Sequence, residues 1–139
     1  MSDLISISNL SPIKRVEKVW GEELWLVNEP GYCSKILVLN QGYQCSKHYH
    51  PIKNETFIIL HGSARIECGF TDKVMIVGDT LTIPAGTPHR FSSRFKKGVL
   101  GNQNQKTIIL EISTHHDDAD VVRLEDSREI DDDNNFIMR

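Results

Sequence analysis

Short segments rich in Val, Ile, Leu and aromatic residues recur along this chain, and turn residues separate them. Segments of this kind lie at 19–27, 32–40, 55–60 and 107–113, and shorter ones at 64–68, 73–77, 80–83 and 89–92. Glycine, proline and asparagine fill the intervals, while no segment has the 3.6-residue period of an amphipathic helix. Regularly spaced short strands of this kind predict an all-β sandwich or barrel.

The chain has three regions of different character. Residues 1–17 are polar with scattered Ile and Leu, and we expect an extended N-terminal arm that adds to a sheet edge of this chain or of a partner. Residues 18–127 hold the predicted strands and form a single barrel domain. Residues 128–139 continue an acidic segment, since Asp117 to Asp133 contains nine of the nineteen acidic residues, and we expect a flexible acidic tail.

Composition narrows the function classes. A chain of 139 residues with 39% hydrophobic and 25% charged residues is typical of one globular domain. The net charge of −3 argues against a nucleic-acid partner. No apolar run approaches eighteen residues and no signal peptide is visible, so neither a membrane nor export is expected and the predicted location is the cytoplasm. Three cysteines without close spacing predict free thiols, and strand parity predicts that Cys45 points away from His48.

Two histidines and a carboxylate predict a metal site. His48 and His50 project from one strand face because strand side chains alternate. Glu55 can return to that face after the turn at 51–54, and His89 begins a later strand after a second turn. Imidazole and carboxylate ligands suit a divalent ion such as Zn, Mn, Fe, Ni or Co, and the sequence does not choose among them.

The residues around these ligands resemble a known superfamily. The motifs are G-x5-H-x-H-x4-E-x6-G over 42–62 and G-x5-P-x-G-x2-H over 78–89. Both resemble the cupin superfamily residue by residue, although Ser93 stands where members often have Asn. The resemblance implies a double-stranded β-helix, or jelly-roll barrel, enclosing a metal ion held by His48, His50, Glu55 and His89.

Two charged residues on apolar strands are candidates for chemistry beside the metal. Glu111 interrupts the strand at 107–113, where a buried carboxylate is costly unless it is paired or faces a wet cavity. It is therefore a candidate for proton transfer, the alternative being a solvent-facing Glu on an edge strand. Lys35 either neutralises a substrate oxyanion or extends to the surface. Of the adjacent His115 and His116, at most one is expected at the barrel mouth.

A narrower resemblance concerns the flanking segments. Lys18-Val-Trp-Gly-Glu22 and the segment from Leu110 to Asp126 resemble cupin-type sugar isomerases of the mannose-6-phosphate and D-lyxose types. The resemblance implies aldose–ketose isomerisation through an enediol, with Glu111 as the base and Lys35 contacting a sugar or sugar phosphate. The chain lacks the Gly-Arg that follows the Glu-Asp pair in many phosphomannose enzymes, which weakens the case for a phosphorylated substrate.

Two other functions are compatible with the same ligands. One is an iron-dependent cupin dioxygenase, and the other is a carbohydrate-binding cupin without turnover. Oxygen consumption would identify the first, and a pocket without ordered acid or base groups would favour the second. A homodimer is expected under all three functions, because small cupins pair through strands and the N-terminal arm suits such pairing.

Overall fold

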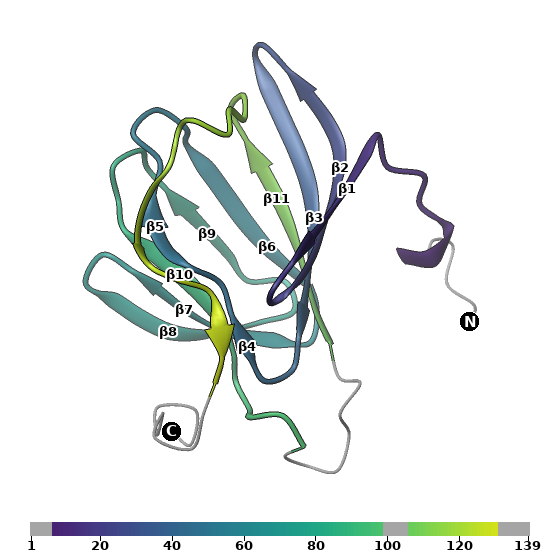
Figure 1. The fold of residues 1–139 in the computed structure, drawn as a ribbon, viewed down its shortest axis with the longest axis vertical. Coiled ribbons are helices and arrows are strands. Elements are labelled where there is room, and N and C mark those ends of the chain that lie inside the picture. Colours follow the sequence, from purple (N-terminus) through teal and green to yellow (C-terminus); the bar gives the residue numbers. More distant parts are fainter. Residues whose placement is uncertain (1–6, 99–105, 131–139) are drawn as a thin grey trace.

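The computed structural model describes residues 7–98 and 106–130, which form two antiparallel β-sheets facing each other (Figure 1). In the first sheet the strand order is β1 (Lys14–Lys18), β2 (Gly21–Glu29), β3 (Tyr32–Asn40), β11 (Lys106–Ser113), β6 (Glu55–His61) and β9 (Thr80–Ile83). In the second sheet the order is β12 (Val122–Glu125), β5 (Lys47–Tyr49), β10 (His89–Ser93), β4 (Tyr43–Gln44) and β13 (Arg128–Glu129), with β7 (Ser63–Cys68) pairing β10 and β8 (Thr71–Ile76).

The all-β jelly-roll prediction is confirmed. The only helix in the described part of the chain is the 3-10 turn η1 (Ile7–Asn9), so none there is long and apolar enough to cross a membrane. In the region expected to be an extended arm, β1 adds to the edge of the first sheet beside β2, and after β11 the structure adds β12 and β13, which the sequence analysis did not predict. Residues 131–139, most of the predicted acidic tail, lie outside the described residues.

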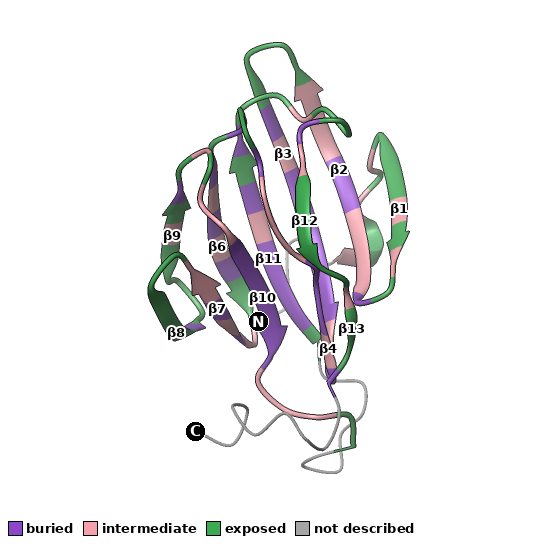
Figure 2. Ribbon diagram, turned by 60° about the vertical axis from the view of Figure 1, so that its left-hand side comes forward, coloured by how far each residue is buried: buried purple, intermediate pink, exposed green. Residues whose placement is uncertain are grey.

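The hydrophobic core lies between the two sheets. The central strands β3, β6, β10 and β11 are buried along much of their length, whereas β8 and β12 are largely exposed (Figure 2). Phe57, Ile59, Ile66, Phe91 and Ile109 share one buried cluster, as strand alternation requires of inward-facing positions. The candidate site lies against this apolar cluster.

Gly21, at the start of β2, is a position where only glycine fits. Its φ of 150° is unfavourable for other residues, and an added Cβ would collide with the carbonyl oxygen of Val38 on β3. We expect Gly21→Ala to lower the free energy of unfolding by about 2 kcal/mol or more. Denaturant titration measures the loss.

Gly31→Ala is the matched control. Gly31 lies in the exposed β2–β3 turn, and an added Cβ there meets no atom within 4 Å. Its effect should stay within about 0.5 kcal/mol. Equal effects of the two substitutions would contradict the steric account of Gly21.

Candidate metal centre and cavity

Three histidines converge inside the barrel. His48 on β5 and His89 on β10 are paired in register across the second sheet, and His50 follows directly after β5. One ring nitrogen from each lies within 4.8 Å of the others, so that among the described residues this trio forms a group that could hold a metal ion. His50 and His89 are buried and His48 is half-buried. The spacing of the first motif and the register of β5 with β10 together produce this convergence.

Main-chain carbonyls fix the orientation of all three rings. The Nδ1 atoms of His48, His50 and His89 lie 2.9, 2.7 and 2.9 Å from the carbonyl oxygens of Ser46, Asp120 and Thr87, respectively. A carbonyl only accepts, so each Nδ1 donates its hydrogen and each Nε2 keeps its lone pair. Burial, followed by the proximity of His89 and His50, lowers the pKa of His48 to about 3. Neutral imidazoles with free Nε2 atoms are the form that binds metals.

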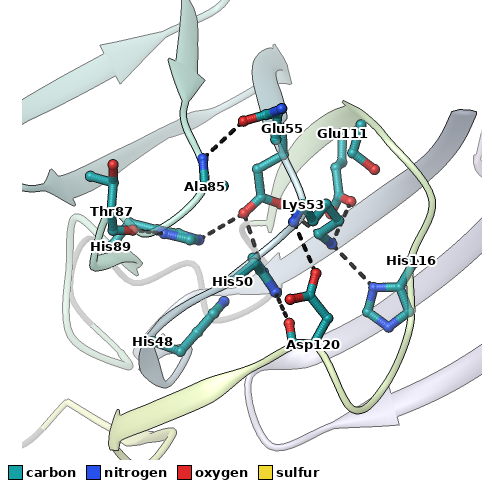
Figure 3. A network of polar contacts seen from close by, with 12 residues as sticks. His48, His50, Lys53, Glu55, Ala85, Thr87, His89, Glu111, His116 and Asp120 are labelled. Atoms are coloured by element: carbon teal, nitrogen blue, oxygen red, sulfur yellow. Dashed lines mark hydrogen bonds and ion pairs between the residues drawn. The ribbon is translucent and has the colours of Figure 1, made fainter.

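Glu55 faces two of these nitrogens. Its Oε2 lies 3.3 Å from His50 Nε2 and 2.9 Å from His89 Nε2, and the residue is only 2% exposed (Figure 3). Burial opposes ionisation of Glu55, but contacts with His50 and His89 and the charge of Lys53 hold its pKa well below the usual range. The carboxylate is therefore an acceptor that faces further acceptors.

This arrangement fits a metal ion. Among the described side chains, Glu55 Oε2 and His89 Nε2 are buried and have no hydrogen-bond partner. Two acceptors in contact repel each other unless a proton or a metal ion lies between them. Two ligands about 2.1 Å from one ion stand about 3.0–3.4 Å apart at right or tetrahedral angles, which is close to the separations at Glu55. Of the predicted set, His48, His50 and His89 thus form one candidate ligand group, and Glu55 Oε2 lies beside two of them, His50 and His89.

A cavity of about 600 Å³ opens beside these residues. One row of paired residues crosses four strands of the first sheet, from Trp25 through Lys35 and Glu111 to Phe57, and all four line the cavity. Glu111 is 4% exposed and Lys35 is 1% exposed. Since β11 lies between β3 and β6, Glu111 is not on an edge strand, and Lys35 does not extend to the surface. Both candidates from the sequence therefore face the cavity.

Lys53 joins the predicted metal ligands to Glu111. It lies in the loop between β5 and β6, and its Nζ is 3.1 Å from Glu111 Oε2 and 3.6 Å from Glu55 Oε1 (Figure 3). Burial lowers its pKa, but the charges of Glu111 and Glu55 outweigh burial and raise it. Asp120 holds this loop, because its carboxylate accepts the main-chain N–H groups of Ile52 and Lys53. Sequence analysis missed both residues, since a loop carries no strand period.

His116 completes the polar cluster. Its Nδ1 lies 3.1 Å from the Nζ atoms of both Lys35 and Lys53, while its Nε2 lies 2.9 Å from Asp118 Oδ1. Burial, with the adjacent charges of Lys35 and Lys53, lowers its pKa to about 4, so the ring is neutral near pH 7. His116 is the member of the His115–His116 pair that lines the cavity.

The prediction for Cys45 was wrong in its direction. Cys45 is buried in the core and lines the cavity together with His48. Strand pairing is interrupted at residues 45 and 46, between β4 and β5, so alternation does not carry across this break. Its Sγ lies 3.3 Å from the main-chain N of Phe91, and burial raises the pKa of the thiol to about 12. It is accordingly a core thiol.

Comparison with known proteins identifies the superfamily. Residues 35–100 match the family model described as a cupin domain. The uncharacterized protein YdbB of Bacillus subtilis (strain 168) is 32% identical over 116 residues, which cover 80% of this chain and 94% of that protein. The chain belongs to the cupin superfamily. The narrower resemblance to sugar isomerases stays a prediction.

Solved structures agree on the fold. KdgF from Halomonas sp. has a TM-score of 0.60 at 12% identity, covering 70% of this chain and 81% of that one. Oxalate decarboxylase from Bacillus subtilis has a TM-score of 0.67 at 16% identity, covering 86% of this chain and 31% of that one. The capsular polysaccharide assembling protein CapF from Staphylococcus aureus has a TM-score of 0.69 at 15% identity, covering 87% of this chain and 35% of that one. This chain thus spans about a third of the latter two.

The buried lysine at the centre of the cluster should be needed for stability. Lys53→Met leaves the buried carboxylates Glu55 and Glu111 without their common cation, and we expect a loss of about 3 kcal/mol or more in the metal-free protein. Denaturant titration measures it. Lys53→Met combined with Glu111→Gln should recover part of the loss, whereas exposed Lys73→Met serves as the control. A loss no larger than that of Lys73→Met would contradict the ion-pair account.

Proposed function

We propose that this cupin is a metal-dependent isomerase that interconverts an aldose and a ketose, acting on a sugar or sugar phosphate. The observation that carries the proposal is the buried Glu111 carboxylate, which Lys53 holds beside Glu55 in a cavity large enough for a monosaccharide. The resemblance of the flanking segments to cupin-type sugar isomerases adds support. Oxalate decarboxylase among the structural neighbours illustrates that the fold carries enzymes.

Aldose–ketose interconversion moves one proton between neighbouring carbons. When bound, a divalent ion polarises the substrate's carbonyl and hydroxyl oxygens. Glu111 takes the proton from the carbon beside the carbonyl and returns it to the former carbonyl carbon, while the hydroxyl proton passes to the former carbonyl oxygen. An enediol is the intermediate, and no external oxidant is required. Lys53, 3.1 Å from Glu111, orients the carboxylate.

The rest of the cavity orients the sugar and limits its access to water. Trp20, Phe57 and Phe91 provide an apolar floor, and Trp25 lines the cavity beside Lys35, whose Nζ lies 4.2 Å from the centre of its ring. Lys35 contacts the substrate's oxygens from the β3 side. An ordered cluster of acid and base groups beside the histidines favours turnover over a purely binding function, because binding alone has no use for the costly burial of Glu111 and Lys53.

Ketose formation from mannose 6-phosphate, mannose and lyxose tests the proposal. We expect Glu111→Gln to lower kcat by about 10²–10⁴-fold with bound metal unchanged, because the variant keeps the shape of the side chain and loses the base. Glu29→Gln, on the exposed end of β2, is the control. Ketose formation that survives Glu111→Gln would remove this residue from the mechanism. Bound metal and oxygen consumption without ketose formation would favour the dioxygenase over the isomerase as the function of this protein.

A further inference from the structure

The cavity lining has one more basic than acidic side chain, in a protein of net negative charge. The lining contains six basic and five acidic side chains, while the whole chain carries −3. The basic residues are Lys14, Arg15, Lys18, Lys35, Lys53 and Arg123. A bound divalent ion would make this local excess larger. A cavity whose charge is opposite to that of its protein favours anionic ligands.

Two buried ammonium groups share one acceptor within this cavity. The Nζ atoms of Lys35 and Lys53 each lie 3.1 Å from the Nδ1 of His116, so they are no further apart than twice that distance. His116 Nε2 faces the Asp118 carboxylate, so it carries the hydrogen, and Nδ1 offers a single lone pair. One lone pair cannot satisfy two ammonium groups at full strength.

Lys35 is left with more donors than acceptors. Its three N–H donors have His116 Nδ1 as the one hydrogen-bond partner shown among the described residues. The Glu23 carboxylate is at the longer ion-pair distance of 3.6 Å, and the face of Trp25 lies 4.2 Å away. A side chain 1% exposed carries a charge that burial makes expensive unless acceptors surround it.

We infer that Lys35 and Lys53 form a subsite for an oxyanion of the substrate, so that the substrate is a sugar acid or sugar phosphate rather than a neutral sugar. Only the statement that the substrate is a sugar rests on the proposed function. A carboxylate or phosphoryl group supplies the acceptors that Lys35 lacks, and the nearby Lys53, which already pairs with Glu111 and Glu55, adds a second positive charge beside it. Lys53 also contacts Glu111 and Glu55, which places this subsite next to the proposed base and metal ligands. His116 acts as a positioning residue that holds the two lysines together.

The test compares three monosaccharides that differ in charge. D-glucuronate, D-mannose 6-phosphate and D-mannose are titrated into the purified protein, and Trp fluorescence is followed because Trp25 contacts Lys35 and His116. We expect at least one anionic sugar to bind about tenfold or more tightly than mannose, the gain typical of a charge-assisted hydrogen bond. Comparison of glucuronate with mannose 6-phosphate identifies the oxyanion.

Variants assign the preference to the lysine pair. Lys35→Met should reduce the anionic preference to within about twofold of mannose, whereas exposed Lys73→Met should leave it unchanged. If Lys35→Met fails to fold, Lys35→Met with Glu23→Gln removes both members of the ion pair and tests the same point. Mannose binding as tightly as both anionic sugars, no binding of any of the three, or a preference that survives the loss of Lys35 would each overturn the subsite.

The same samples separate this inference from the proposed function. Anionic preference without ketose formation would keep the subsite and reject the isomerase. Ketose formation from mannose without any anionic preference would keep the isomerase and reject the subsite.

Discussion

Acceptor atoms that face one another inside the barrel set the main constraint on this structure. Glu55 Oε2 lies within 3.3 Å of two imidazole Nε2 atoms whose rings are held by hydrogen bonds from Nδ1 to main-chain carbonyls. Together with the Ser46 carbonyl that holds His48, those carbonyls belong to three segments distant in sequence, and Glu55 belongs to the opposite sheet from His48 and His89. A cation at this point therefore links the two sheets, and folding of the barrel preorganises its ligands.

A second group of charged residues is in contact with the predicted metal ligands. Lys53 connects Glu55 to Glu111, and His116 connects Lys53 to Lys35. Since Lys35 and Glu111 are directly opposed across β3 and β11, the register of these two strands places the candidate base and the candidate anion subsite side by side. The charged groups of the cavity thus come mainly from the row of paired residues across the first sheet and from the loop between β5 and β6.

Local patterns in the sequence were enough to predict the fold and part of the candidate site. The apolar strand around Glu111 predicted either a carboxylate facing a wet cavity or a solvent-facing one on an edge strand, and its burial on β11, between β3 and β6, selects the first. Parity failed at Cys45, because it holds only while a strand continues, and pairing breaks at residues 45 and 46.

Long-range contacts could not be predicted in this way. Lys53 lies in a loop, and the carboxylate of Asp120 holds that loop from 67 residues along the chain. The pairing of Lys35 with Glu111 requires the register of β3 with β11, two strands more than 60 residues apart in sequence. Their local sequences predict strands but carry no information about which strand pairs with which. The structure was therefore needed to find the lysine pair.

Quantifying the metal bound by the purified protein tests the central claim most directly. Elemental analysis of protein prepared without chelator, and again after loading with Zn, Mn, Fe, Ni or Co, should give one equivalent per chain. His48→Ala should lose it, and His61→Ala, a histidine on the exposed end of β6, should retain it. No metal under any loading condition, or retention in His48→Ala equal to that in His61→Ala, would contradict the account. Glu55 and the three histidines would then be a polar cluster joined by a shared proton.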